Sequence, residues 1–200
     1  LAWEYNEEGL RASQAGKHRR AVYYFSKAIE IKPGVSTFYN NLGRSYYWLS
    51  DFDRALRAYR QAKALGPEMA TERAALKTNI GDIYRQRKNF AEAVRYYHEA
   101  LEQSPNLARV HYELGNLYLK KRETKQAEYR LNRALAIDPE YSHARLARVI
   151  LYHLTYRDDK AWDDVQQLER QGFQIRRDLK QDILRGMQAA KDRERFQPAH

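Results

Sequence analysis

The six histidines are the side chains in this sequence best suited to bind a metal or to act as a general base, and their spacing fits neither role. A helical metal site needs two histidines four residues apart, and no pair has that spacing. A histidine base also needs a nucleophile, yet the chain has no cysteine and no Gly-x-Ser-x-Gly motif. The histidines are His18, His98, His111, His143, His153 and His200. They predict neither catalysis nor metal binding.

One glycine-containing segment has part of the pattern of a phosphate-binding loop. It runs from Gly9 to Lys17 and ends in Gly16-Lys17. A phosphate loop needs four residues between its glycines and a serine or threonine after its lysine, because that hydroxyl binds Mg²⁺. Here six residues separate the glycines and His18 follows the lysine, so the segment predicts no nucleotide cofactor.

An acidic cluster is the remaining candidate for chemistry. It consists of Asp158, Asp159, Asp163 and Asp164. A helix would place Asp159 and Asp163 on one face, where two carboxylates can bind a hard cation. Acids at a helix start are more simply explained by their interaction with the helix dipole. We therefore expect no catalytic, cofactor-binding or metal-binding residues. If the chain belongs to an enzyme, we expect it to be a regulatory subunit.

The composition is that of a folded protein. The chain has 200 residues, 43% hydrophobic and 12% aromatic, which is enough to bury a core. Charges interrupt every apolar run, so no membrane span is expected. The chain begins at Leu1, as expected of a processed protein or of a soluble part of a longer one. The arginine-rich, cysteine-free composition favours a bacterial protein, in the cytoplasm or as a periplasmic or membrane-anchored soluble domain.

The spacing of the prolines and glycines indicates an internal repeat. The prolines at the repeat ends are separated by 34, 38 and 34 residues, and three further series have the same spacing. The extra four residues fall between Glu68 and Arg73, a stretch rich in helix formers, and predict one more turn in the first helix of the third unit. The four series are Pro33, Pro67, Pro105, Pro139; Gly9, Gly43, Gly81, Gly115; Ala21, Ala55, Ala93, Ala127; and Ala28, Ala62, Ala100, Ala134.

Between these markers the apolar residues recur with the period of an α-helix, which predicts two amphipathic helices in each unit. The second helices are expected to start at Ser50, Asn89 and Thr124, and Asn89 and Glu92 have the spacing of a capping box. Each repeat-end proline lies just past a helix end, where it cannot continue the helix. Each unit is therefore predicted to be a helix hairpin, with small residues where the two helices approach.

This pattern resembles the tetratricopeptide repeat, a 34-residue motif with fixed aromatic, Leu-Gly, Tyr, Ala and Pro positions. The third unit departs from it at Lys77, the first at Glu8 and Ala12, and the fourth at His111 and Leu131. The second unit carries the pattern complete, as Tyr39, Leu42, Gly43, Tyr46, Ala55, Tyr59, Ala62 and Pro67, and a fifth keeps only Tyr152 and Ala161. The resemblance implies an all-α fold, a right-handed α-solenoid of stacked helix-turn-helix hairpins.

The expected boundaries follow from the repeat. Repeats are expected at about 2–35, 36–69, 74–107 and 108–141, with a degenerate unit at 142–172 that ends at Gly172. A solenoid needs a capping element with a polar outer face, and a capping helix is expected at 173–190. Its apolar stripe consists of Ile175, Leu179, Ile183, Leu184 and Met187. Residues 191–200 lack such a stripe and are expected to form a charged flexible tail.

The resemblance also implies a concave groove, lined by the first helix of each unit, that binds a segment of a partner protein. Asn41 and Asn79 have amides suited to bonding a partner backbone, although the same amides can satisfy neighbouring helix turns. The groove positions are Asn6, Leu10, Asn40, Asn41, Arg44, Tyr47, Thr78, Asn79, Asp82, Arg85, Arg109, Tyr112, Asn116, Lys120, His143 and Ile150.

The net charge of +10 is concentrated at the turns between paired helices, which share one edge. Asp51 and Asp53 interrupt this basic edge in the second unit. The simplest interpretation is that this edge is only solvated. If it binds a partner, an acidic protein or lipid headgroups are favoured. Nucleic acid is disfavoured because no aromatic residues that could stack on bases are interleaved with the basic residues. The basic edge consists of Lys17, Arg19, Arg20, Arg85, Arg87, Lys88, Lys120, Lys121 and Arg122.

The function predicted from these observations is that of a non-enzymatic scaffold or adaptor, which holds a segment of a partner protein in its groove within a larger assembly. Two alternatives remain open. The chain is a self-associating structural module, a homo-oligomer built through its fifth unit and capping helix, or it is a basic platform for an acidic protein, a membrane surface or nucleic acid.

Overall fold

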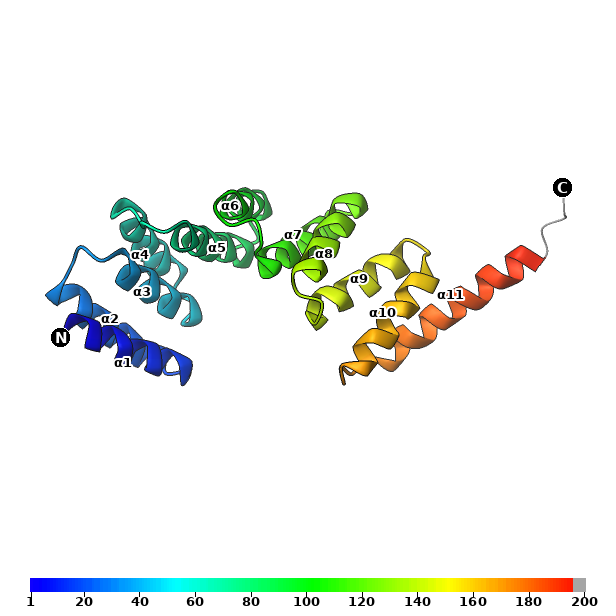
Figure 1. The fold of residues 1–200 in the computed structure, drawn as a ribbon, viewed down its shortest axis with the longest axis horizontal. Helices are drawn as coiled ribbons and strands as arrows, with labels where there is room; N and C mark the ends of the chain where they lie inside the picture. The colour runs from blue at the N-terminus through cyan, green and yellow to red at the C-terminus, as the bar shows by residue number, and fades with distance from the viewer. Residues whose placement is uncertain (196–200) are drawn as a thin grey trace. The chain divides into compact units, whose positions relative to one another are not determined.

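The computed structural model describes residues 1–195, and in that range it consists of α-helices and the turns between them, with no strand (Figure 1). No helix among these residues is long and apolar enough to cross a membrane. The helices are α1 (Ala2–Gln14), α2 (His18–Ile31), α3 (Ser36–Trp48), α4 (Phe52–Ala64), α5 (Ala70–Gln86), α6 (Phe90–Gln103), α7 (Ala108–Lys120), α8 (Thr124–Ile137), α9 (Ser142–Leu154), α10 (Asp158–Arg170) and α11 (Arg177–Arg195).

The first ten helices pack as five successive hairpins, one in each expected repeat. The longer first helix expected in the third repeat is confirmed, because α5 has 17 residues whereas α1, α3, α7 and α9 have 13 each. It begins at Ala70, four residues before the boundary expected at 74. The inserted residues are good helix formers and extend α5 by one turn at its start.

Each hairpin turn has one residue in the left-handed region of backbone conformation. The residue is Gly16 in the first turn (φ 70°), then Ser50 (59°), Lys88 (58°), Arg122 (59°) and Tyr156 (55°). This conformation reverses the chain within a few residues, and only glycine adopts it without strain.

The caps of the second helices follow these left-handed residues. Asn89 is confirmed as a cap, since its side chain accepts a hydrogen bond from the backbone N–H of Glu92 at 3.3 Å. Thr124 is the first residue of α8, as expected. The expected start at Ser50 is wrong: Ser50 is used for the turn, and the cap of α4 is Asp51, which accepts from the backbone N–H of Arg54 at 3.0 Å.

The repeated glycines allow the two helices of a hairpin to approach closely. A Cβ atom at Gly9 would lie 2.5 Å from the ring of Phe25, and one at Gly81 would lie 2.8 Å from the ring of Tyr97. At Gly43 an added Cβ would overlap the ring of Tyr59 in the same way. A buried aromatic ring therefore occupies the space that a side chain on the first helix would need, which confirms the packing role expected for these glycines.

The chain divides into two compact units, where the sequence predicted one solenoid over residues 1–172. Unit 1 extends from Leu1 to Pro105 and holds α1 to α6; unit 2 begins at Asn106 and holds α7 to α11. Each has its own core. Tyr59 and Ile83 are fully buried in unit 1, and Leu131 and Leu168 are fully buried in unit 2.

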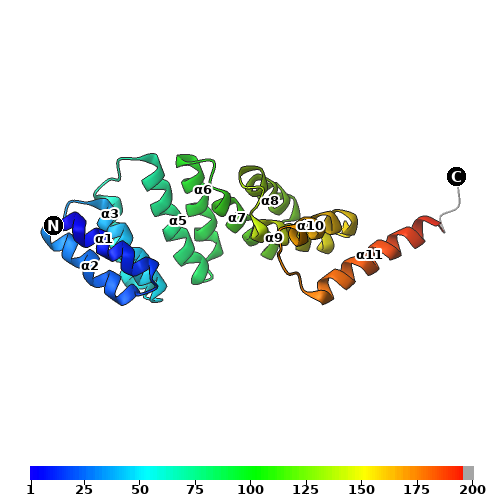
Figure 2. The same cartoon turned by 60° about the horizontal axis from the view of Figure 1, so that its bottom comes forward.

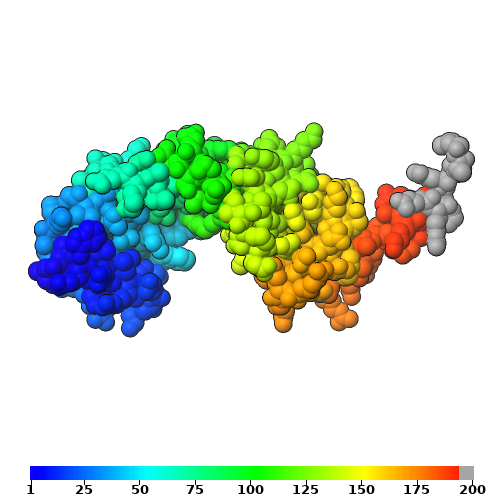
Figure 3. Space-filling view, in the orientation of Figure 1, coloured from blue at the N-terminus to red at the C-terminus, as the bar shows by residue number. Residues whose placement is uncertain are grey.

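One face of helix α11 packs on the end of unit 2. Ile183 is fully buried against α9 and α10, with Leu179 and Met187 partly buried beside it. Leu184, expected in this stripe, is 44% exposed because it lies about 100° around the helix from Ile183. The C-terminal half of α11 projects beyond α10 (Figures 1, 2 and 3).

The bounds of α11 differ from those expected for the capping helix. The helix begins at Arg177 instead of residue 173 and continues to Arg195. Phe173 and Ile175 precede it and pack on the same core as Ile183. Residues 191–195 of the expected flexible tail are helical, because they continue a helix already started, and residues 196–200 lie outside the described range.

Candidate functional site

Two adjoining hollows lie in unit 1 at the N-terminal ends of α3 and α5. The larger has a volume of about 390 Å³ and the smaller about 200 Å³. They share Ser36, Thr37, Pro67 and Glu72, so they form one continuous surface. The larger is also lined by Trp3, Lys32, Gly34, Val35, Leu65, Gly66, Glu68 and Met69, and the smaller by Asn40, Thr71, Ala75 and Leu76.

Large apolar side chains surround the larger hollow and remain open to solvent. Trp3 is 52% exposed, Leu65 39% and Met69 59%. The ring of Trp3 is fixed by Phe38, which it meets edge to face with the ring centres 4.8 Å apart. Exposed tryptophan and methionine side chains beside a hollow are typical of a protein-binding surface.

Polar groups converge on the smaller hollow. The Thr37 hydroxyl donates to Oε1 of Glu72 over 3.3 Å and orients the carboxylate. The Oδ1 atom of Asn40 accepts a hydrogen bond from Nδ2 of Asn79 over 3.0 Å. This bond uses the acceptor of the Asn40 amide and leaves its Nδ2 group as the donor. The surface therefore offers an acceptor at Glu72 and a donor at Asn40, the two groups needed to bond an extended backbone.

The loop before α5 sets the shape of both hollows. Gly66 adopts a left-handed backbone conformation (φ 68°), and Pro67 follows it. The guanidinium of Arg73 donates to the carbonyl oxygen of Pro67 at 3.2 Å and to that of Glu68 at 2.6 Å. It also bonds Gln103 of α6 at 2.8 Å, so the loop is tied to the second helix of its own hairpin.

The groove residues predicted for unit 1 are used mostly for packing. Asn6 and Asn41 are buried and bond each other, and Asp82 is buried and accepts from the hydroxyl of Tyr97 at 2.7 Å. Among the remaining positions, Arg44 is exposed, Tyr47 and Arg85 are half-buried, and Thr78 is buried. The hydroxyl of Tyr47 accepts a hydrogen bond from Gln86 at 3.0 Å, and Leu10 packs in the core. Only Asn40, with Asn79 behind it, belongs to the hollows.

The groove residues predicted for unit 2 lie on α7. Arg109 and Lys120 are exposed, and Tyr112 and Asn116 are half-buried. Tyr112 packs on Tyr141 with the ring centres 5.1 Å apart, and the aromatic contacts continue through His143 to Phe173. Burial raises the pKa of Tyr141 to about 12, and the neighbouring Tyr112 adds to the shift. Further along α9, Ile150 is 39% exposed.

The basic edge is partly neutralised in unit 1. Arg87 forms a salt bridge with Asp53 at 2.6 Å, and Arg54 pairs with Asp51 at 2.5 Å. The backbone N–H of Arg54, which is the larger cause, and its guanidinium hold the pKa of the Asp51 carboxyl below its usual value. Of the other cations of the edge, Arg85 is half-buried, whereas Lys17, Arg19, Arg20 and Lys88 in unit 1 and Lys120, Lys121 and Arg122 in unit 2 are exposed. An anionic partner for this edge stays a prediction.

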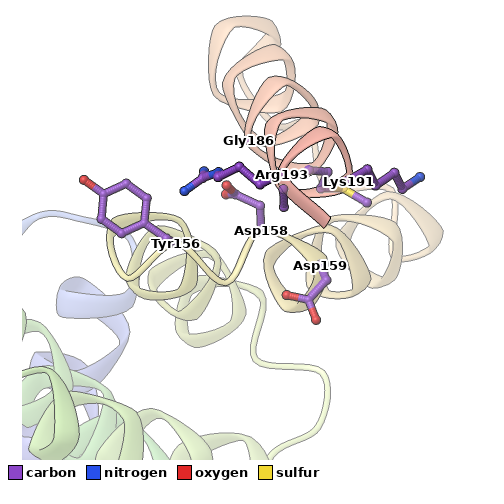
Figure 4. A pocket seen from close by; sticks show the side chains of 8 residues that line it. Tyr156, Asp158, Asp159, Gly186, Lys191 and Arg193 are labelled. Atoms are coloured by element: carbon purple, nitrogen blue, oxygen red, sulfur yellow. The ribbon is translucent and has the colours of Figure 1, made fainter. Parts of the chain in front are cut away.

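Two members of the acidic cluster, Asp158 and Asp164, contact different partners. Asp164 receives hydrogen bonds from Arg148 at 2.7 Å and from Arg145 at 3.2 Å, and Asp158 contacts Nδ1 of His153 at 2.7 Å. A third hollow, of about 430 Å³, lies between the start of α10 and α11. There Asp158 projects toward Gly186, whereas Asp159 points away from α11 (Figure 4). The described residues contain no group of three side chains that could hold a metal ion.

The residues that shape the hollows of unit 1 were missed by the sequence prediction. They are Trp3, Leu65, Met69 and Glu72, none of which is a groove position of the 34-residue motif. The four-residue insertion between Glu68 and Arg73 was the available signal, because it adds a turn to α5 and places Met69 and Glu72 beside α3.

Comparison with known proteins identifies the family. Tetratricopeptide repeat models match residues 36–69 and 72–140, together just over half of the chain. The chain belongs to the tetratricopeptide repeat family. Its helical hairpins and its structural relatives confirm the expected fold class, an all-α solenoid of stacked tetratricopeptide hairpins.

Three similar proteins illustrate the range of this family. The BBSome complex member BBS4 homolog of Drosophila melanogaster is 27% identical over 169 residues, which are 80% of this chain and 34% of that protein. The APC/C hetero-tetramer Cut9-Hcn1 is 26% identical with a TM-score of 0.66, over 72% of this chain and 28% of that one. The type IV pilus biogenesis factor PilW is 20% identical with a TM-score of 0.78, over 95% and 87%.

The chain spans about a third or less of the length of the first two relatives. Tetratricopeptide repeat proteins mediate protein–protein interaction and the assembly of complexes, as the BBSome and APC/C relatives illustrate. The repeat itself is generally a non-catalytic scaffold. The coarser part of the expected function, membership in a family of protein-interaction modules, is confirmed.

Proposed function

We propose that this chain is a non-enzymatic scaffold that holds an extended segment of a partner protein against the first helices of unit 1, within a larger assembly. The observation that carries the proposal is the pair of adjoining hollows at the starts of α3 and α5, with Trp3, Leu65 and Met69 exposed beside them. Exposed apolar side chains next to oriented polar groups are the anatomy of a small recognition surface.

The polar groups of the hollows suit a segment in extended conformation. Asn40 presents amide donors and Glu72 presents a carboxylate, and both are held by hydrogen bonds from within the protein, to Asn79 and Thr37. Such fixed partners lower the entropy lost when a segment binds. Helices α1, α3 and α5 neighbour one another in turn, so a segment several residues long can extend from Trp3 to Glu72.

The test is selection from a phage-displayed library of random dodecapeptides on the whole chain. Peptides enriched on the wild-type protein are expected to lose at least tenfold in affinity for Met69→Ala and Trp3→Ala. Tyr129→Ala is the matched control, because Tyr129 is 58% exposed on α8 of unit 2 and lies outside the hollows. Enriched peptides that bind all three variants as they bind the wild type would place the binding surface elsewhere and contradict the proposal.

A further inference from the structure

We propose that the hollows of unit 1 select a partner segment that carries a lysine or arginine side chain, bound by Glu72, next to an apolar side chain that packs on Trp3 and Met69. The inference rests on the proposed function and specifies the chemistry of the partner. It reverses, for this surface, the acidic partner that the net charge of +10 favours for the chain as a whole.

The charge of the smaller hollow points to a cationic side chain. Among the described residues that line it, Glu72 is the single ionisable one. The other lining residues are small, apolar or neutral, so a cation that enters meets one carboxylate and no positively charged lining residue; the nearby guanidinium of Arg73 is directed to the carbonyl oxygens of Pro67 and Glu68. Glu72 is half-buried, and the attraction between opposite charges is stronger there than in open water.

The geometry of Glu72 leaves it able to bind a donor. Its Oε1 accepts one hydrogen bond, from the hydroxyl of Thr37 at 3.3 Å. A carboxylate has two oxygens with about four acceptor sites, so most of its capacity remains. A guanidinium can form two parallel hydrogen bonds to such a group, and an ammonium can form one.

The larger hollow adds to the negative charge. Glu68 and Lys32 line it together with Glu72, so it holds two carboxylates and one ammonium. Both Lys32 and Glu68 are exposed at the surface, whereas Glu72 lies deeper and belongs to both hollows. An acidic segment or a free terminal carboxylate would be repelled at the point where the two hollows meet.

The size of the two spaces assigns one class of side chain to each. The smaller hollow, at about 200 Å³, suits a single long side chain. The larger, at about 390 Å³, has an apolar wall of Trp3, Leu65 and Met69. An aliphatic or aromatic residue beside the cation would bury its surface there at about 25 cal/mol per Å².

The experiment is a parallel selection from the same dodecapeptide library on the wild type, on Glu72→Arg and on Glu102→Arg. Glu102 is exposed on α6 and lies outside the hollows, so its variant matches the change in net charge. Lysine and arginine next to an apolar residue are expected to be enriched on the wild type and on Glu102→Arg. Aspartate and glutamate are expected to replace them on Glu72→Arg.

A titration of the best wild-type peptide completes the test. Replacement of its arginine by citrulline, which keeps the shape and removes the charge, is expected to weaken binding to the wild type at least tenfold. The same replacement is expected to change binding to Glu72→Gln less than twofold. Thermal unfolding of each variant, followed by circular dichroism, verifies that the fold is retained.

The outcomes separate this inference from the proposed function. Peptides without charge preference, or with the same preference on the wild type and on Glu72→Arg, would overturn the cationic segment; loss of their binding in Met69→Ala would still support the proposed function. A selection that enriches no peptide on the wild type would overturn both.

Discussion

Asn41 on α3 donates a hydrogen bond from Nδ2 to Oδ1 of Asn6 on α1 over 3.0 Å, and both amides are buried. One repeat further along the chain, Asn79 on α5 donates to Asn40 on α3 over the same distance. The first helices of unit 1 are therefore joined in series by asparagine pairs. A pair of this kind fixes the rotation of one helix against the next, because a small rotation would break the hydrogen bond between the two amides and leave them unpaired in a buried contact.

We expect Asn41→Ala to lower the free energy of unfolding by about 1–3 kcal/mol, because it leaves the buried amide of Asn6 without its donor. The double variant Asn6→Ala, Asn41→Ala should lose less than the sum of the single variants. Urea unfolding measures both, with the exposed Asn106→Ala as control. Additive losses would show that the two side chains do not interact in solution.

The glycines on the first helices should differ in their tolerance of alanine. Gly43→Ala is expected to destabilise unit 1 by about 1–3 kcal/mol, because the added methyl overlaps the rigid ring of Tyr59. Gly115→Ala meets the flexible side chain of Leu131, at 2.8 Å, and should be better tolerated, helped by the higher helix propensity of alanine. Thermal unfolding of both variants compares them, and equal losses would contradict the role of the ring.

The left-handed turn residues allow a test in both directions. Gly16→Ala is expected to destabilise the chain by about 1–2 kcal/mol through backbone strain alone, since no atom lies within 4 Å of the added Cβ. Lys88→Gly relieves the same strain and should be neutral or stabilising by up to about 1 kcal/mol. Urea unfolding decides the sign. A clear destabilisation by Lys88→Gly would mean that its left-handed conformation is not retained in solution.

Gly186 should be essential for the position of α11. An added Cβ would overlap the carboxylate of Asp158, which cannot swing away freely because it is buried and contacts Nδ1 of His153 at 2.7 Å. We expect Gly186→Ala to speed tryptic cleavage within α11 by tenfold or more, and the added change Asp158→Ala to reverse part of that effect. Ala190→Ser, on the same helix and in the same hollow, is the control. Cleavage at the wild-type rate in Gly186→Ala would contradict the close contact.

Tyr141 should make stability fall at alkaline pH. Its pKa is raised from 10.0 to about 12 in the folded chain, first by burial and then by Tyr112, so the folded state holds the phenol proton more tightly than the unfolded state. The contribution is complete below pH 10 and is lost as the pH rises toward 12. The unfolding free energy should therefore decline less steeply between these values in Tyr141→Phe. Identical slopes in urea unfolding would show that Tyr141 is not protected from ionisation.

The repeat made much of the local structure predictable. Four series with one spacing located the hairpins, and the extra turn of α5 followed from four additional residues of good helix propensity. The cap at Asn89 followed from local hydrogen-bonding chemistry, whereas Ser50 was misplaced because its left-handed conformation leaves no mark in the residue type. Helix bounds depend on interactions within a few residues of the chain, so a sequence pattern can predict them.

The candidate site was predictable in much smaller part. Asn6, Asn41 and Asp82 stand at groove positions of the motif, but the structure buries them in hydrogen bonds between helices. Trp3, Met69 and Glu72 stand far apart in the chain or outside the motif, and only the packing of α1, α3 and α5 brings them together. The sequence by itself determined the family and the helical hairpins. Tertiary structure decided which polar side chains face each other and which face solvent, because that depends on the distances between helices and not on their periodicity.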